Sequence, residues 1–342
     1  MPISKQIRKV GEYLLRMISA VKTIGISDCS YLLAHFNTES QKHAINFWKS
    51  FEGELIPIPV TLNPIRCSIL VPYRNNWHLT KKCLQSILDQ NLRSVRLQII
   101  LIDNGSTEEE IELELVDFMS NEKVLWRKIR VDSEFNFSRL NNTGALETES
   151  FAPKYYLFLN NDVELTDDLC LEKTLLFKEM LGAKCGAVGC TLLYPNNKIQ
   201  HLFLAPGIKI VGGHPLKGMP YDHTMVWFEC PRPVAAVTGA FLLVSVEQFA
   251  EVGGFDESLA TAYQDLDLCL KLQNATGVLS NWVLPGVICT HFENATRRKK
   301  HNWKETEIMY GKWANQLSKN KDFSDVFSKE SEFPTLKLFR WI

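Results

Sequence analysis

YYLFLNNDVELTDD, residues 155–168, is the most informative segment of the chain. Five apolar or aromatic residues run directly into Asn160, Asn161 and Asp162. A strand covered on both faces cannot alternate with polar residues, so the apolar run predicts a buried parallel strand. Open α/β sheets bind ligands at the carboxyl ends of such strands. A carboxylate flanked by amides suits a hard divalent cation that also holds phosphates, although Asn and Asp at this place also serve as helix caps.

Composition excludes several classes of protein. The 342 residues are 45% hydrophobic and 23% charged, as in ordinary globular proteins. The net charge of -1 gives no field that would attract nucleic acid. Nine scattered cysteines without a C-x-x-C pair favour reduced, buried thiols and a cytoplasmic location. No run approaches the ~18 apolar residues of a membrane span.

Strands and helices are expected to alternate from residue 65. Apolar runs predict strands at 66–73, 95–102, 123–131 and 155–159, with helices over 78–90 and from about 108. Such alternation predicts βαβ units and an α/β fold with a mostly parallel central sheet. Beyond residue 162 we expect strands at 186–193, 234–244 and 283–290, a long loop at 195–232 and a helix within 256–274.

Three regions are predicted along the chain: a helical N-terminal extension at 1–60, a main domain at 61–300 and a C-terminal helical segment at 301–342. Apolar residues at positions 7, 10, 14, 18 and 21 form one stripe. Its simplest interpretation is a helix packed on the main domain, with peripheral membrane contact or a dimer contact as alternatives. The basic run Arg297–Lys300, followed by His301, is a solvated loop or a contact for phosphates or anionic lipid.

The predicted strand ends carry the candidate chemistry. Tyr73 and Arg74 follow the first strand, Asp103 follows the second and Asp162 the fourth, so all should lie along one edge of the sheet. No G-x-G-x-x-G or G-x-x-x-x-G-K-[ST] motif follows the first strand. A bound nucleotide would therefore be held by side chains and a metal rather than by a Rossmann or phosphate-binding loop.

A second group follows Gly253. Asp265 and Asp267 stand two residues apart at a helix start, so their carboxylates cannot face the same way. One can serve as a general base while the other caps or pairs. His291 follows an apolar strand and is either structural or a ligand of a metal or diphosphate.

Six segments in order resemble the family 2 glycosyltransferases of the GT-A fold, over about residues 66–295. They are CSILVPYRNNWHLTKKCLQSIL, IILIDNGST, FNFSRLNNTGA, LFLNNDVE, VTGAFLLVSVEQFAEVGGFDESL with YQDLDLCLKL, and ICTHFENAT. The subgroup that the chain resembles extends bacterial surface polysaccharides such as O-antigen or capsule. The resemblance implies an inverting, metal-dependent enzyme that moves a sugar from a nucleotide-diphosphate sugar to a glycan or lipid-linked acceptor. It would work in the cytoplasm, with the inner face of the plasma membrane as an alternative place.

Donor roles carried over from the family fall on ten positions. Pro72, Tyr73 and Arg74 would line the nucleobase pocket, and Asp103 would contact the base or ribose. The remaining donor-side residues would be Asn136, Ser138, Asn142, Asn160, Asn161 and Gly239.

The family's catalytic and metal roles are also carried over by position. Asp162 would bind Mg²⁺ or Mn²⁺ that bridges the donor diphosphate, with His291 completing that site. Asp265 would be the catalytic base and Asp267 the second choice. Gln200 and His201 match a segment that faces donor or acceptor.

Two departures from the family pattern leave room for another class of function. Asn160 stands where many relatives have a first metal-binding Asp, and Gln264 stands where Glu is commoner before the base. A non-catalytic sugar-nucleotide or glycan-binding module is the alternative function, and a nucleotidyltransferase is a more distant one. The chain lacks the Q-x-x-R-W signature of the processive relatives.

Overall fold

The computed structural model describes residues 64–108, 110–221, 231–275, 277, 278, 280–293, 302–318, 330 and 332. The predicted N-terminal extension at 1–60, the basic run at 297–301 and most of the C-terminal segment beyond 318 lie outside these residues. The three-part division of the chain therefore stays a prediction.

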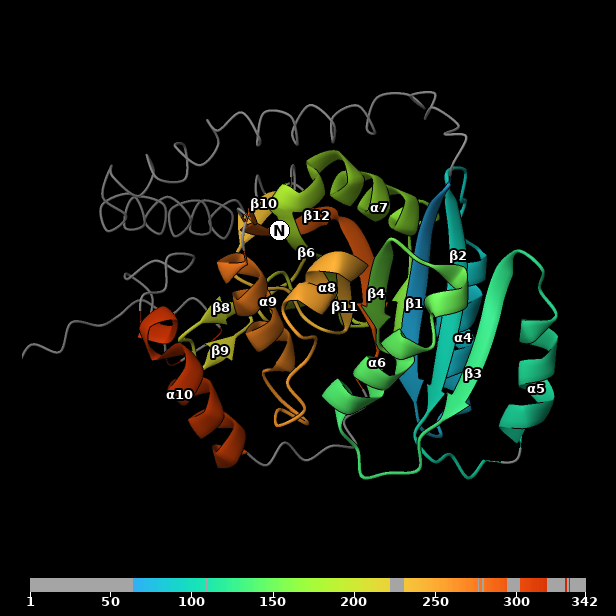
Figure 1. The fold of residues 1–342 in the computed structure, drawn as a ribbon, viewed down its shortest axis with the longest axis horizontal. Coiled ribbons are helices and arrows are strands. Elements are labelled where there is room, and N and C mark those ends of the chain that lie inside the picture. Colours follow the sequence, from blue (N-terminus) through green and yellow to red (C-terminus); the bar gives the residue numbers. More distant parts are fainter. Residues whose placement is uncertain are drawn as a thin grey trace, which may run out of the picture.

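A central sheet organises the described residues (Figure 1), with strand order β10-β12-β6-β11-β4-β1-β2-β3. One half consists of β1 (Ile65–Tyr73), β2 (Val95–Asp103), β3 (Val124–Arg130) and β4 (Tyr155–Leu159), all parallel. The other half consists of β6 (Cys185–Leu193), β10 (Arg232–Val234), β11 (Phe241–Ser245) and β12 (Ser280–His291). Of these, β6 and β12 are parallel to each other, while β11 runs antiparallel to both β4 and β6.

The central strands form because their residues are buried on both faces. In β1 only Arg66 is exposed, and its other eight residues are buried. Alternate residues such as Ile69 and Val71 pack on one face with α4 (Trp77–Leu88), α5 (Glu110–Met119) and α7 (Cys170–Leu181). Leu70 packs on the other face with α6 (Phe137–Leu146), α8 (Val246–Glu251), α9 (Gln264–Asn274) and α10 (Trp303–Ser318). The result is a three-layer α/β/α arrangement, which requires continuously apolar strands.

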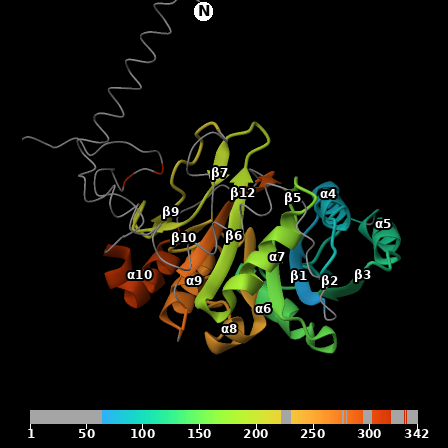
Figure 2. The same cartoon turned by 90° about the horizontal axis from the view of Figure 1, so that it is seen from above.

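Two short strands extend the central sheet: β5 (Val163–Leu165) pairs with β12, and β7 (Ile199–His201) pairs with β6. β8 (Ala205–Pro206) and β9 (Gly212–Gly213) pair with each other in a separate two-stranded sheet. In both views α9 and α10 lie at one end of the molecule and α5 at the other (Figures 1 and 2). No helix among the described residues is long and apolar enough to cross a membrane.

Two expectations from the sequence were wrong. The strand predicted at 234–244 is two separate strands, β10 and β11, with residues 235–240 forming a turn between them. The region 195–232 was predicted to be loop, yet its described part contains β7, β8 and β9 and buries apolar residues such as Leu202 and Ile208. The first error arose because residues 235–240 are small and buried, which an apolar run in the sequence does not distinguish from a strand.

Candidate functional site

The parallel strands end at one edge of the sheet. Tyr73 and Asp103 are register partners at the ends of β1 and β2, and Asp103 is in register with Arg130 at the end of β3. The order 3-2-1-4 reverses between β1 and β4, which is the kind of switch point where open α/β sheets bind ligands. The predicted site residues Asn160, Asn161 and Asp162 follow β4 at this point.

Asp162 and His291 come together although 129 residues separate them. β5 and β12 pair antiparallel, with Val163 opposite His291, so the residue before β5 lies beside the imidazole. Nε2 of His291 lies 3.0 Å from Oδ1 of Asp162. The backbone N–H of Phe292 also donates to the Asp162 carbonyl at 2.9 Å. Two predicted metal-binding side chains are thus adjacent.

The Asp162–His291 pair fits a divalent cation that also binds the donor. A carboxylate oxygen and an imidazole nitrogen 3.0 Å apart are both acceptors unless a proton or a cation lies between them. Within the described residues, no third His, Cys, Asp or Glu joins them to make a group of three. Mg²⁺ and related ions are commonly held by one or two protein ligands together with substrate phosphates, which this pair allows.

The backbone of three consecutive residues, 238–240, is hydrogen-bonded to predicted site residues. The N–H of Thr238 donates to Nε2 of His201 at 3.2 Å, and the N–H of Gly239 donates to Oδ2 of Asp265 at 2.9 Å. The carbonyl of Ala240 accepts from the N–H of Asn160 at 3.0 Å. The turn before β11 therefore links the residues after β4 to the start of α9.

Asp265 has the surroundings of a general base. Its side chain is partly buried, and its oxygens accept from Gly239 and from the N–H of Leu266. Burial raises the pKa of the Asp265 carboxyl above its ordinary value, and these hydrogen bonds offset the rise only in part. Two carboxylate oxygens offer about four lone-pair positions, so acceptor capacity remains for a proton.

Asp267, unlike Asp265, forms ion pairs with lysine side chains. Its side chain is fully buried, with Nζ of Lys271 2.9 Å from Oδ2 and Nζ of Lys312 2.6 Å from Oδ1. The Trp313 indole also donates to Oδ1 at 2.8 Å. Asp267 therefore ties α9 to α10, as expected when two carboxylates two residues apart point in different directions.

The predicted donor residues of α6 bond to the segment before the base. Asn136 caps α6 and donates to the Glu257 carbonyl at 2.8 Å, while Ser138 donates to the Leu259 carbonyl at 2.6 Å. Asn142 donates to the Phe255 carbonyl at 2.9 Å and accepts from the Phe255 N–H at 3.0 Å. In this conformation all three side chains hold residues 255–260.

Sequence patterns did not reveal Glu305. Its buried carboxylate in α10 accepts from the N–H groups of Ala260 and Thr261 at 2.9 and 3.0 Å and from the Thr261 hydroxyl. The segment 255–261 is thus held by α6 on one side and α10 on the other. No signal could have found this role, because a Glu in a charged helix start looks like a solvated residue.

The predicted nucleobase residues lie at the opposite end of the site. Pro72 and Tyr73 are buried and Arg74 is exposed. The buried Tyr73 hydroxyl has no hydrogen-bond partner among the described residues, and burial, followed by Asp103, raises its pKa. Asp103 is buried, accepts from the Ser106 N–H at 2.7 Å and pairs with Arg130 at 3.1 Å.

Gln200 and His201 are buried rather than open to solvent. His201 is 1% exposed, and its Nδ1 lies 2.8 Å from Nδ1 of His214. Burial, followed by the nearby His214, lowers the pKa of His201 well below its ordinary value. Gln200 contacts His291 at 2.6 Å. Neither side chain is free for an acceptor in this conformation.

Asn161 and Gly239 are held by neighbouring groups. Nδ2 of Asn161 donates to the Thr80 hydroxyl at 2.8 Å. A Cβ added at Gly239 would lie 3.0 Å from the Phe137 ring and 3.5 Å from Cβ of Asp265, so a side chain there would crowd the predicted base.

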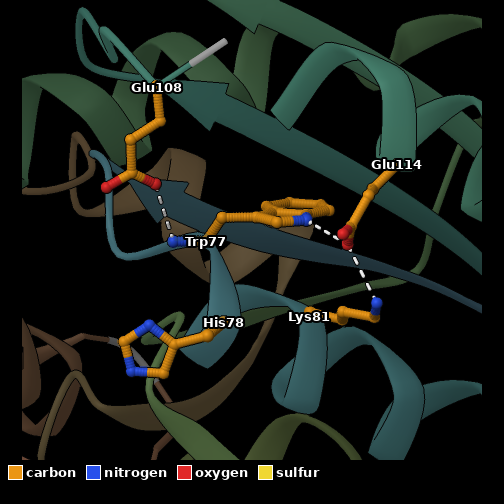
Figure 3. A pocket seen from close by; sticks show the side chains of 5 residues that line it. All are labelled: Trp77, His78, Lys81, Glu108 and Glu114. Atoms are coloured by element: carbon orange, nitrogen blue, oxygen red, sulfur yellow. Dashed lines mark hydrogen bonds and ion pairs between the residues drawn. The ribbon is translucent and has the colours of Figure 1, made fainter. Parts of the chain in front are cut away.

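A pocket of about 370 Å³ lies between α4 and α5 (Figure 3), and the ring of its lining residue Trp77 is 6.4 Å from the ring of Tyr73. Its lining residues are Trp77, His78, Lys81, Glu108 and Glu114. Glu108 accepts from the N–H groups of Asn76 and Trp77. Glu114 accepts from both Trp77 and Lys81 (Figure 3). These contacts join α4 to α5 and to the residues before it.

Comparison with known proteins identifies the family. The sequence profile of "Glycosyl transferase family 2" matches residues 68–248. The chain belongs to glycosyltransferase family 2. The "O-antigen biosynthesis protein RfbC" of Myxococcus xanthus is 32% identical over 253 residues, covering 70% of this chain and 18% of that protein. The "Uncharacterized protein y4gI" of Sinorhizobium fredii (strain NBRC 101917 / NGR234) is 29% identical over 295 residues, covering 78% and 31%. This glycosyltransferase chain therefore spans less than a third of either relative.

Solved structures confirm the GT-A fold of this family 2 glycosyltransferase. GalNAc-T7, solved with UDP, GalNAc and Mn²⁺, matches with a TM-score of 0.59 at 13% identity, over 75% of this chain and 49% of that one. The mannosyltransferase PcManGT of Pyrobaculum calidifontis, solved with GDP-Man and Mn²⁺, matches with a TM-score of 0.52 at 15% identity, over 86% and 75%.

Proposed function

We propose that this chain transfers a sugar, with inversion, from a nucleotide-diphosphate sugar to a hydroxyl of a surface glycan or its lipid-linked precursor. The adjacency of Asp162 and His291 at the switch point of the sheet is the observation that carries the proposal. The similarity to the RfbC protein supports a surface polysaccharide as the acceptor. Seven described cysteines are free and buried, which supports a reducing cytoplasm as the place of action.

In this proposal a divalent cation would be held by Asp162 and His291. When bound, Mg²⁺ or Mn²⁺ would neutralise the charge that develops on the nucleoside diphosphate as it leaves. The structural neighbours solved with Mn²⁺ support this choice of ion class. Asn160 adds an amide beside His291, with Nδ2 3.5 Å from Nε2.

Asp265 would supply the general base. Its carboxylate would take the proton of the acceptor hydroxyl while that oxygen bonds to the anomeric carbon. The bond from that carbon to the diphosphate oxygen breaks on the opposite face, and the electron pair leaves with the diphosphate. A single displacement of this kind inverts the anomeric centre. The raised pKa of Asp265 makes it a stronger base than an exposed carboxylate.

The donor-binding end of the site would be formed by the ends of β1 and β2. In this proposal the nucleobase or ribose would bind beside the Asp103 carboxylate and the Tyr73 hydroxyl, which has no hydrogen-bond partner in the described part of the chain. Arg130 covers Asp103 in this conformation and would shift to admit the donor.

A donor screen tests the proposed function. Purified chain with Mn²⁺ or Mg²⁺ meets UDP-, dTDP- and GDP-sugars, and release of nucleoside diphosphate is measured. Release from one donor that is lost in both Asp162→Ala and Asp265→Asn would support the transferase. Metal-dependent donor binding by calorimetry that never leads to transfer to any glycan acceptor would instead indicate a sugar-nucleotide-binding module.

A further inference from the structure

His291 has a second hydrogen bond, on the side of the ring that faces away from Asp162. Its Nδ1 lies 2.6 Å from Oε1 of Gln200 on β7. The ring is 9% exposed, so these two contacts define its orientation.

The Gln200 amide is itself oriented by Glu293. Nε2 of Gln200 donates to Oε2 of Glu293 at 3.1 Å. A carboxylate oxygen accepts and an amide NH₂ donates, so Gln200 must turn its carbonyl oxygen toward His291. That oxygen cannot donate, and Nδ1 of His291 must therefore carry the hydrogen of this bond.

Nε2 is then the nitrogen that faces Asp162, and a proton or a cation must lie between the two. Nε2 faces Oδ1 of Asp162 at 3.0 Å, and the Asn160 amide nitrogen lies 3.5 Å from it. Ligating histidines in metal sites usually donate their other N–H to an oxygen, which fixes the tautomer and aims the lone pair. The contact from Nδ1 to Gln200 is the hydrogen bond that this arrangement requires.

We propose that Gln200 and Glu293 are positioning residues that hold His291 in its Nδ1–H tautomer, with Nε2 aimed at the cation beside Asp162. This inference rests on the proposed function for the role of the cation, but the tautomer itself does not depend on it. Gln200, which the sequence suggested for the acceptor, acts here through His291.

The same contacts extend into the long region after β6. The Tyr194 hydroxyl donates to Oε2 of Glu293 at 3.0 Å, and Nζ of Lys217 lies 3.9 Å from that oxygen. Lys217 also lies 5.8 Å from the centre of the Tyr194 ring. A change in residues 194–217 can therefore reach the metal-side histidine through Glu293.

Nitrogen NMR of the histidine rings tests the tautomer directly. Full-length ¹⁵N-histidine protein is measured without metal or nucleotide at about pH 8, where an ordinary histidine is neutral. The His291 signals are assigned by their loss in His291→Gln. We expect a protonated Nδ1 in the wild type and in Glu293→Gln, which keeps an acceptor for Gln200. Gln200→Leu should give a mixture of tautomers.

Metal binding supplies the second measurement. Binding of Mn²⁺ in the presence of UDP, GDP and dTDP in turn is followed by electron paramagnetic resonance. Loss of such a supporting residue typically weakens metal affinity about 10- to 100-fold, and we expect this for Gln200→Leu and Glu293→Ala but not Glu293→Gln. Melting temperatures identify variants that fail to fold.

The two proposals fail separately. A wild-type His291 without a hydrogen on Nδ1, or equal Mn²⁺ affinity in Gln200→Leu and wild type, overturns the positioning role whatever the enzyme transfers. The expected tautomer in a protein that binds no Mn²⁺ with any of the three nucleotides supports the orientation of the ring and counts against the proposed function.

Discussion

Asp265 and Asp267 share a helix turn but have opposite surroundings. Asp265 accepts from backbone N–H groups and from the Thr238 side chain, whereas Asp267 is paired with two lysines and an indole. Removing one partner of a buried ion pair costs about 3–5 kcal/mol because the other charge stays unpaired. General-base assistance contributes about 100- to 10,000-fold in rate.

These surroundings predict a reciprocal pair of variants. Asp265→Asn should lose about 100- to 10,000-fold in kcat with little change in donor affinity or melting temperature. Asp267→Asn should lower the free energy of unfolding by about 3–5 kcal/mol, which we would measure by urea denaturation. A stable, inactive Asp267→Asn beside an active Asp265→Asn would reverse the assignment.

The raised pKa of Asp265 predicts the acid side of the pH profile. A base works in its deprotonated form, so activity should fall as pH drops through the pKa of Asp265. Because burial raises that pKa, the fall should begin at higher pH than for an exposed aspartate. The measurement is kcat/KM against pH at saturating metal. The residual activity of Asp265→Asn should lack this acid limb, and an identical limb in that variant would assign it to another group.

The sequence predicted which residues could take part in the site, but not which residues their side chains would contact. Strand ends and apolar runs are local signals, and they predicted Asp162 at one edge of the sheet; only the family resemblance implied that His291 would join it. The contacts of Ser138 with Leu259 and of Gln200 with Glu293 join residues far apart in the chain, and no spacing rule encodes them.

At the scale of elements, α10 contacts the segment that contains Asp265, although α10 lies beyond the residues of the family match. Glu305 accepts from Ala260 and Thr261, and Lys312 bridges Asp256 and Asp267 at 2.6 Å each. Burial acts against ionisation of Asp256, yet the bonds from Lys312 and Ser258 outweigh it and lower its pKa to about 2.

The contacts of Glu305 with Ala260 and Thr261, called here the α10 clamp, predict a kinetic effect from a residue remote from the reacting atoms. Glu305→Ala should lower kcat by about 10- to 100-fold while the KM for the donor changes little, since a misplaced base can cost that much. Glu305→Gln retains an oxygen acceptor for the two N–H groups and is the matched control. Steady-state kinetics of both variants decide the point, and equal kcat in Glu305→Ala and wild type would reject the clamp.

Elements were predictable where one signal dominated. The buried strands β1, β2 and β4 have continuous apolar runs, and α4 has a clear apolar face. The sequence did not predict α6 and α7. α6 contains Asn and Ser among its buried residues, and α7 buries Glu172 and Lys178 together with its apolar residues. Neither helix therefore has a continuous apolar face that a sequence pattern would reveal. Their polar side chains are satisfied by distant segments, as in the bond from Lys178 to Gln248.

At the scale of the whole molecule, the site joins the two halves of the sheet. Asp103 and Asp162 come from the half containing β1 and β2, while Asp265 and His291 come from the half containing β6 and β12. A ligand that contacts both halves stabilises the folded state by RT ln(1 + [L]/Kd), about 2.7 kcal/mol at a hundredfold excess over Kd.

Nucleotide with Mn²⁺ should therefore raise the melting temperature of the full chain. UDP, GDP and dTDP, each with Mn²⁺, should separate by the shift they cause, and the donor's own nucleotide should give the largest. Asp162→Ala is expected to keep the metal-independent part of the shift and lose the rest. Equal shifts with Mn²⁺ and with a chelator would contradict the assigned cation site.

The pairing of β5 with β12 also has a consequence for how the protein is made. Asp162 leaves the ribosome 129 residues before His291, which takes roughly 6 to 26 s at ~5–20 residues per second. During that time the parallel strands β1 to β4 can form from neighbouring segments, but the cation site is incomplete. A nascent chain can thus fold the half that contains β1 to β4 before the proposed cation site exists, and β12, the last strand in the described part of the chain, is the one that would complete it.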